Sequence, residues 1–99
     1  MIMKVVYSEE VEIFIKKLDT NDSGHLARTK EFFEAYGFQV GPKYIKKVRG
    51  NLWELRTGKI RLFLYIKGAM CFGVHILYKK SQKLPKKDIK LAIKRSKII

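Results

Sequence analysis

The sequence has 99 residues, of which 46% are hydrophobic, and a formal net charge of +13. A chain of this length forms one domain, which we expect to span residues 1–99, and its hydrophobic content argues against disorder throughout. Cys71 is the only cysteine, which excludes an intrachain disulfide and a cysteine-based metal site.

The positive charge lies almost entirely in the C-terminal two-thirds of the chain. Residues 1–37 contain five Lys or Arg and seven Asp or Glu, whereas residues 38–99 contain seventeen and two. A field this concentrated attracts polyanions and speeds their capture. Nucleic acid is the commonest such partner; an anionic membrane surface or an acidic protein is the alternative.

The N-terminus and the hydropathy pattern indicate a cytoplasmic protein. Residues 1–4 lead directly into a strand-like stretch and lack the long apolar core of a signal peptide. No apolar run approaches the roughly 20 residues of a membrane span, and a lone cysteine suits a reducing compartment. We therefore expect no membrane partner.

The N-terminal third is predicted to form a strand and two helices. Met3–Tyr7 reads as the strand, and Ser8 is a good N-cap for the first helix. Apolar residues then recur at helical spacing: Val11, Phe14, Ile15 and Leu18. Asp19–Gly24 has the composition of a turn. The second helix is predicted from about His25 to Tyr36, where Gly37 stops it.

Beyond Gly41 and Pro42 the pattern changes from helical to extended. Four strands are predicted, at Tyr44–Arg49, Leu52–Arg56, Ile60–Lys67 and Met70–Tyr78. Short glycine-containing turns join them, which is typical of an antiparallel meander.

Alternation within the strand Ile60–Lys67 separates two faces. One face is aliphatic and is predicted to be core: Ile60, Leu62, Leu64 and Ile66. The other combines cations with aromatic rings: Arg61, Phe63, Tyr65 and Lys67. A merely solvated face seldom has this composition, so the second face is a candidate binding surface.

The chain ends in a basic helix. Pro85 suits its first position, and an apolar seam runs along it, formed by Ile89, Ala92 and Ile93. The order of elements predicts an α+β domain in which two N-terminal helices pack on a small, mainly antiparallel sheet of four to five strands, with a C-terminal helix.

Motifs for nucleotide cofactors and for metals are missing from the sequence. It has neither a Walker loop nor a dinucleotide-binding glycine fingerprint, and His25 and His75 lie on different predicted elements. The basic region offers two carboxylates, Glu54 and Asp88. We therefore expect neither a cofactor nor a catalytic metal.

The residue types on the basic sheet are those that metal-free RNA cleavage requires. The 2′-hydroxyl beside the scissile phosphate is the nucleophile, and the protein must remove its proton, stabilise charge at phosphorus and protonate the leaving oxygen. Arginine is suited to stabilising the negative charge at phosphorus, because its planar guanidinium group binds phosphate oxygens and stays protonated. Histidine, tyrosine or a lysine with a lowered pKa suits the proton transfers.

The cationic candidates also have structural interpretations. Arg56 and Arg61 lie in neighbouring strands joined by a short turn, so their side chains can meet across the hairpin. Alternatively both are solvated, or one pairs with Glu54. Lys79 and Lys80 can serve catalysis or simply attract phosphate.

The histidine and tyrosine candidates also have both a functional and a structural interpretation. His75 alternates with Val74 and Ile76, so it is expected to point away from the face that those two residues bury. A structural histidine is the alternative to a catalytic one. Tyr65 and Tyr78 either stack on a base or cover the edge of the core.

Three segments resemble the phage-derived HigB-like branch of the RelE/ParE toxin superfamily. Residues 44–56, Y-I-K-K-V-R-G-N-L-W-E-L-R, are similar to a K-L-R-G-x-L-[YW]-E-L-R segment of that branch. Residues 60–65, I-R-L-F-L-Y, match the [YI]-R-x-x-Y strand that follows it, and residues 77–89 match an F-x-K-K-[ST]-x-K-x-P-x-x-[ED]-I ending. The resemblance extends over about residues 4–97.

This resemblance implies the toxin of a toxin–antitoxin system, a ribosome-dependent endoribonuclease that cleaves mRNA without a metal. It implies two kinds of partner: the ribosome with its mRNA, and a cognate antitoxin, which in this branch usually carries a helix-turn-helix DNA-binding domain. Transferred by position, Arg61 is the clamp on the scissile phosphate and Arg56 is the second arginine. Lys79 or Lys80 neutralises charge or transfers a proton.

His75 and Tyr78 are secondary catalytic candidates, because the branch often has H-G-F where this chain has H-I-L-Y. That change places the histidine one residue further from the basic pair. The candidate RNA-binding residues are Lys46, Lys47, Arg49, Lys59, Lys83, Lys86 and Tyr65. The superfamily also contains ParE-like members that inhibit gyrase, so gyrase inhibition and plain nucleic-acid binding remain alternatives.

Overall fold

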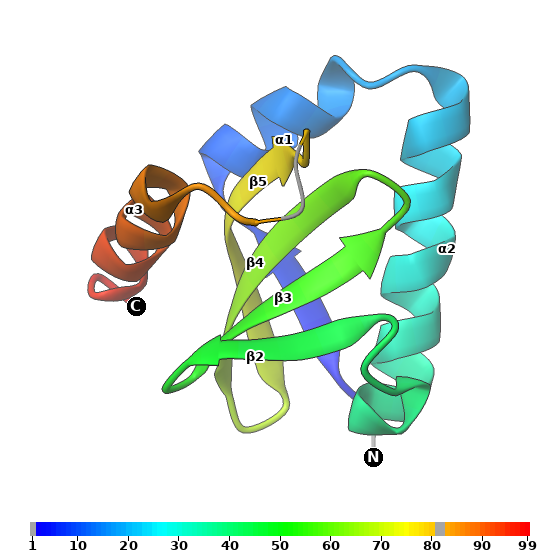
Figure 1. Cartoon of the computed structure of the whole chain (residues 1–99). Coiled ribbons are helices and arrows are strands. Elements are labelled where there is room, and N and C mark those ends of the chain that lie inside the picture. Colours follow the sequence, from blue (N-terminus) through cyan, green and yellow to red (C-terminus); the bar gives the residue numbers. More distant parts are fainter. Residues whose placement is uncertain (1, 81–82) are drawn as a thin grey trace.

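The computed structural model describes residues 2–80 and 83–99, and its strands form one sheet (Figure 1). Met1, Ser81 and Gln82 lie outside the described residues; the last two belong to the basic segment that precedes the C-terminal helix. The strands are β1 (Lys4–Tyr7), β2 (Ile45–Arg49), β3 (Leu52–Thr57), β4 (Ile60–Lys67) and β5 (Met70–Tyr78). They lie in the order β1-β5-β4-β3-β2. β1 runs parallel to β5 and the other neighbouring pairs are antiparallel, which confirms the predicted α+β fold.

Two helices, α1 (Glu9–Lys16) and α2 (Thr20–Tyr36), cover one face of the sheet. Ser8 begins α1 as predicted, because its hydroxyl accepts a hydrogen bond from the backbone N–H of Val11. The aliphatic face of β4 packs against these helices, so its prediction as core is confirmed. The main buried members of this first core are Val11, Leu26, Phe33, Leu55, Ile60, Leu62 and Leu64.

The second helix begins earlier than predicted. Asp19 is its N-cap and accepts a hydrogen bond from the backbone N–H of Asp22 at 2.7 Å, so residues 20–24 are helical and do not form a turn. Polar residues that favour turns also suit a first helical turn when an aspartate caps it. Gly37, with φ of 59°, ends α2 as predicted, and a short 3₁₀ helix that the pattern did not predict, η1 (Gly37–Val40), follows it.

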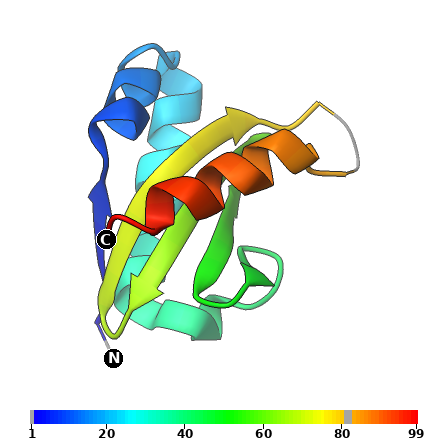
Figure 2. The same cartoon turned by 90° about the vertical axis from the view of Figure 1, so that its left-hand side faces the viewer.

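The third helix, α3 (Lys86–Ser96), crosses the opposite face of the sheet (Figure 2). It closes a second core whose buried members are Leu52, Phe63, Val74, Leu77 and Ala92. Phe63 is fully buried there and Tyr65 packs half-buried against the same cluster. On the cationic and aromatic face of β4, Phe63 and Tyr65 are therefore covered by the second core. Arg61 is partly exposed at the start of the strand.

A bulge in β5 breaks the expected alternation of side chains beside His75. Phe63 of β4 pairs with His75, but the next residue of β4 pairs with Gly73, so β5 holds an extra residue at this point. Val74 consequently belongs to the second core and Ile76 to the first. The prediction that both residues are buried on one face, opposite His75, was wrong, because a bulge breaks the alternation of side chains.

Cys71 lies in the first core, and its thiol is expected to resist alkylation. The side chain is 0% exposed, and burial, with a further contribution from Glu34, raises the pKa of the thiol to about 11. Because the thiolate is the reactive form, a raised pKa lowers the reactive fraction at any mildly alkaline pH. We expect reaction with iodoacetamide to be at least about 100-fold slower in the folded protein than in denaturant. Equal rates would show that the thiol is accessible.

Among the described residues, no helix is long and apolar enough to cross a membrane.

Candidate active site and nucleic-acid interface

Arg56 and Arg61 face each other across the β3–β4 hairpin. They are direct partners in the antiparallel register, one pair before the turn that Gly58 and Lys59 form. Directly opposed side chains on one face have Cβ atoms about 5 Å apart, and like charges in such pairs repel. This end of the hairpin therefore holds two cations that an anion between them would stabilise.

Arg61 is held by the backbone of its own turn. Its Nη1 donates hydrogen bonds to the carbonyl oxygens of Gly58 at 2.7 Å and Ile60 at 3.0 Å. Its Nε is buried and has no hydrogen-bond partner among the described residues. Burial lowers the pKa of the Arg61 guanidinium, while Glu54 raises it and Arg56 lowers it. The guanidinium keeps its charge at neutral pH, because an arginine pKa starts far above that range.

Glu54 fixes the other arginine. Its side chain is 2% exposed, and its Oε1 accepts a hydrogen bond from Nε of Arg56 at 2.7 Å. The second oxygen, Oε2, is buried without a partner in the described part of the chain. A buried carboxylate is tolerated when a cation pairs with it, so this ion pair sets the position of Arg56. The sequence left open whether both arginines are solvated or one of them pairs with Glu54. In the structure, Arg56 pairs with Glu54.

Replacing Glu54 by glutamine should lower the free energy of unfolding by about 1–2 kcal/mol. The substitution keeps the side-chain volume but removes the charge-assisted hydrogen bond, and the partial exposure of Arg56 limits the loss. Guanidinium unfolding would measure the difference. The control is Glu31→Gln, at an exposed position on α2, for which we expect a change within about 0.5 kcal/mol. Equal losses in both variants would contradict the role assigned to Glu54.

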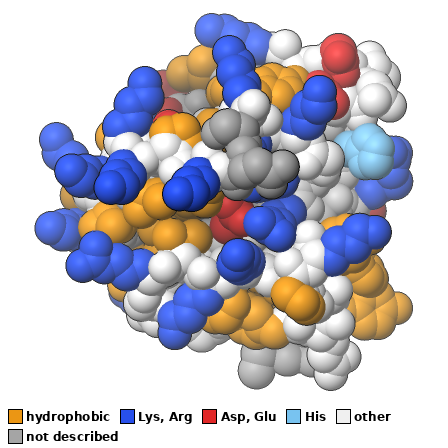
Figure 3. Space-filling view, in the orientation of Figure 1, with side chains coloured by type: hydrophobic (Ala, Val, Ile, Leu, Met, Phe, Trp, Pro, Cys, Tyr) orange, Lys and Arg blue, Asp and Glu red, His pale blue; other side chains and the backbone are white. Residues whose placement is uncertain are grey.

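A first hollow, of about 270 Å³, lies between β2, β3 and the segment that leads to α3. We call it the sheet hollow. Cations contribute most of its lining: Lys46, Lys47 and Lys83, which were predicted to bind RNA, and Arg56 and Lys79, which were predicted to be catalytic. Glu54 is the carboxylate among the described lining residues. Figure 3 shows how Lys and Arg side chains gather over this face of the molecule.

The basic pair after β5 lies next to the β3–β4 turn. The backbone N–H of Lys79 donates to the carbonyl oxygen of Lys59 at 2.7 Å, which ties the end of β5 to the turn. Lys79 is half-buried and Lys80 is exposed. With Lys59 and Tyr78 they line a further hollow of about 810 Å³. The structure thus brings Lys59 and Lys79 to the same end of the sheet as the two arginines.

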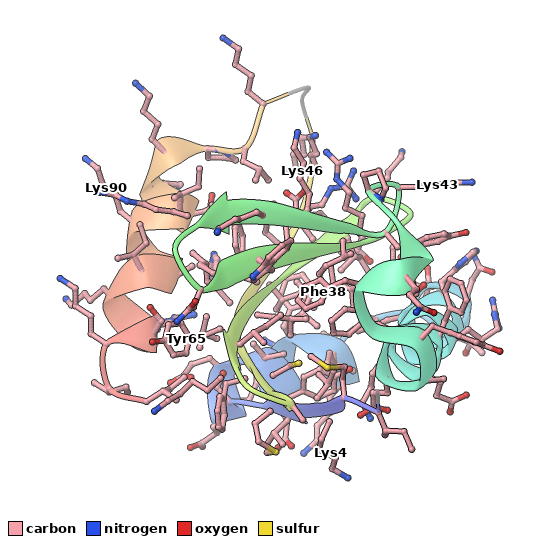
Figure 4. All side chains as sticks on the ribbon, turned by 90° about the horizontal axis from the view of Figure 1, so that it is seen from below. Lys4, Phe38, Lys43, Lys46, Tyr65 and Lys90 are labelled. Atoms are coloured by element: carbon pink, nitrogen blue, oxygen red, sulfur yellow. The ribbon has the colours of Figure 1, made fainter. Side chains whose placement is uncertain are left out.

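Three of the predicted RNA-binding residues lie elsewhere. Arg49 and Tyr65 both pair with Leu52, at the far end of β3 from the arginines. Figure 4 shows Tyr65 beside α3 and away from Lys43 and Lys46. Lys86 is exposed at the start of α3. These three side chains do not line the hollows beside Arg56 and Arg61.

His75 is held between the sheet and α3. Its Nε2 lies 2.8 Å from Oδ1 of Asp88, its Nδ1 lies 3.0 Å from Nη1 of Arg95, and its ring stacks on Phe63 with centroids 5.8 Å apart. Arg95 also donates to the carbonyl oxygen of Val74. Both ring nitrogens therefore have partners from α3, and these contacts anchor the helix over the sheet.

Tyr78 lies on the other face of the sheet from Arg61. Its ring packs against Phe14 of α1, with centroids 5.8 Å apart, and its hydroxyl donates to Asp22. The hydrogen bond to Asp22, with smaller contributions from desolvation, Asp22 and Asp19, raises the pKa of Tyr78 to about 12. A tyrosine with a raised pKa stays protonated at neutral pH and is a poor base there.

A second hollow, of about 560 Å³, lies on the other side of the arginine pair and was missed by sequence reasoning. We call it the helix hollow, because α2 forms one wall. Its lining residues are His25, Arg28, Thr29, Phe32, Lys43, Tyr44, Arg56, Thr57, Gly58 and Arg61. The spacing of the four α2 residues, at i, i+3, i+4 and i+7, is a signal that could have placed them on one helical stripe.

The described residues contain no group of three or more His, Cys, Asp or Glu side chains that could hold a metal ion. The described groups that line the two hollows include guanidinium and ammonium ions, one buried carboxylate, the His25 imidazole and aromatic rings. Their chemistry suits phosphate oxygens and planar bases.

Comparison with known proteins places the chain in a family. The model of the phage-derived protein Gp49-like family (DUF891) matches residues 13–97. The chain belongs to the Gp49-like family. This is a RelE-like, toxin-like family of toxin–antitoxin systems, so an antitoxin is the implied partner. Among curated proteins no match was found.

The Gp49-like match includes the whole candidate site. Residues 13–97 contain α2, strands β2 to β5 and α3, and therefore both hollows and the arginine pair. The predicted relationship to phage-derived, RelE-like toxins is confirmed at the level of this family, and the HigB-like branch stays a prediction.

Proposed function

We propose that this Gp49-like protein is the toxin of a type II toxin–antitoxin pair, an endoribonuclease of the HigB-like kind that cleaves mRNA on the ribosome. The observation that carries the proposal is the opposed pair Arg56 and Arg61, fixed by Glu54 and by the Gly58 carbonyl between two cation-lined hollows. A phosphate between the two guanidinium groups relieves their repulsion. The cognate antitoxin is expected to carry a helix-turn-helix DNA-binding domain.

The proposed reaction needs only the RNA and protein side chains. The 2′-hydroxyl gives up its proton, its oxygen forms a bond to the adjacent phosphorus, and the bond from phosphorus to the 5′-oxygen breaks. The 5′-oxygen takes up a proton, which leaves a 2′,3′-cyclic phosphate and a 5′-hydroxyl. Arg61 stabilises the charge that develops on the phosphoryl oxygens, with Arg56 as the second cation.

The proton transfers are assigned to the basic pair after β5. Lys79 is half-buried beside the β3–β4 turn, lines the sheet hollow with Arg56, and lies at the same end of the sheet as the two arginines. Lys80 is its exposed neighbour. His75 and Tyr78 remain secondary candidates, and both have hydrogen-bond partners that hold them away from the arginines.

Docking on the ribosome rests on the remaining cations. Lys46, Lys47 and Lys83 line the sheet hollow, and α3 adds a basic outer surface. Contacts of this kind bind RNA backbone regardless of sequence, and their strength falls as salt rises. Docking and cleavage are therefore expected to depend on different residues.

The experiment that tests the function is mRNA cleavage by the purified protein on translating ribosomes, with the same mRNA free of ribosomes as the control. We expect cuts within the codon in the decoding site, cyclic phosphate ends on the products, and little cleavage of the free mRNA. A folded protein that leaves mRNA intact contradicts the proposal. Growth arrest without cleavage would instead indicate inhibition of gyrase or another target, and no arrest would indicate plain nucleic-acid binding.

A further inference from the structure

The helix hollow adjoins the proposed cleavage site and has no role in the proposed reaction. Both arginines belong to its lining, so it begins where the phosphate is expected to lie. Its floor is fixed by a hydrogen bond from Oγ1 of Thr29 to Oγ1 of Thr57 at 3.1 Å, which joins α2 to β3. At about 560 Å³ it is large enough for a planar base and its sugar.

One wall of the helix hollow is aromatic. Phe32 of α2 packs edge-on against Tyr44, with ring centroids 5.4 Å apart and an interplanar angle of 84°. Phe32 also packs against Tyr36, at 5.4 Å and 62°. Phe32 is 39% exposed and Tyr44 is half-buried, so ring surface remains open. Aromatic side chains placed this way bind bases by stacking.

The rest of the lining is cationic. Arg28 and Lys43 are exposed lining residues of the helix hollow, and Nζ of Lys43 lies 5.6 Å from the centroid of the Tyr44 ring. No Asp or Glu occurs among the described lining residues. Figure 4 shows Lys43 and Lys46 along the same edge of the molecule, so the positive surface continues from one hollow towards the other. Exposed aromatic rings can stack on a base, and neighbouring cations can bind its phosphate, so this combination is typical of a nucleotide-binding site.

We propose that the helix hollow binds the nucleotide next to the scissile phosphate, with its base against Tyr44 and Phe32 and its phosphate between Arg28 and Lys43. This inference rests on the proposed function, because it places the RNA strand relative to Arg61. The contacts with the base give the enzyme a preference for the nucleotide that occupies the hollow. The contacts of the arginines with phosphate do not depend on sequence.

The test uses the full-length protein and two readouts. The first is the affinity for a fluorescent RNA trinucleotide made uncleavable by 2′-O-methyl groups. The second is the distribution of cut sites on ribosome-bound mRNA. Tyr44→Leu keeps apolar bulk but removes the stacking ring, and Lys43→Gln removes the charge. The control, Lys67→Gln, removes an exposed cation at the other end of β4.

We expect Tyr44→Leu with Lys43→Gln to weaken trinucleotide binding about tenfold or more and to flatten the base preference of the cut sites. Lys67→Gln should stay within about twofold of the wild type. Wild-type cleavage with unchanged affinity and cut sites in the double variant overturns the inference and leaves the proposed function intact. No cleavage by any form overturns the proposed function, and trinucleotide binding alone then decides the inference.

Discussion

Replacing Arg61 by alanine is expected to lower the rate of mRNA cleavage by about 100- to 1000-fold, the usual cost of removing one preorganised donor to developing charge. The guanidinium is positioned before substrate arrives, by hydrogen bonds to the carbonyls of Gly58 and Ile60. Affinity for the ribosome should change only a few-fold, because many other cations contribute to docking. Single-turnover cleavage and ribosome co-sedimentation measure the two quantities separately.

Two further substitutions sharpen this prediction. Arg61→Lys keeps a positive charge but loses the planar fork, so we expect most of the rate to be lost. Lys67→Ala removes a cation from the same strand and the same face, away from the hollows, and should cleave at nearly the wild-type rate. An Arg61→Ala variant that loses rate and affinity in equal proportion would show that Arg61 only docks RNA.

The Phe63→Ala variant is expected to lose about 3–5 kcal/mol of its free energy of unfolding, as is typical of a buried Phe truncated to Ala. The ring is 0% exposed and stacks on His75 beneath α3. Its removal leaves a cavity among Leu52, Val74 and Ala92 and loosens the support of the helix. For a domain of this size the loss is a large share of the total stability. Equilibrium unfolding in guanidinium would measure it.

Phe32→Ala is the matched control, because it removes the same side chain from a position that is 39% exposed. We expect less than half the loss seen for Phe63→Ala, since less apolar surface leaves the protein interior. A small loss at Phe63 would mean that α3 does not pack on the sheet in solution. His75 would then be free of the contacts that hold it away from the arginines.

Local patterns were enough for most of the elements. The strand β4 was predicted with its bounds, because strict alternation over eight residues has one simple explanation. The helix α1 was predicted from a capping serine and an apolar stripe, and both are present. The predicted start of α2 was wrong. The same polar residues favour either a turn or a capped first helical turn, and the sequence alone does not distinguish the two.

The candidate site was only partly predictable. Arg56 and Arg61 were expected to be neighbours because the turn between their strands is short, and the register makes them direct cross-strand partners. The partners of His75 were not predictable, because Asp88 and Arg95 come from α3, and how that helix packs on the sheet is a tertiary contact. The helix hollow was missed because its residues come from three segments that are distant in the chain.

The sequence by itself determined the α+β class, the order of strands and helices, the location of the positive charge, and the resemblance to phage-derived toxins. These depend on periodicity, turn residues and composition, which act over a few neighbouring positions. The tertiary structure alone decided that α3 buries Phe63, that Glu54 holds Arg56, and that α2 completes a second hollow beside the arginines. Each of these is a contact between segments far apart in sequence, and its formation depends on how complete elements pack, which no local pattern records.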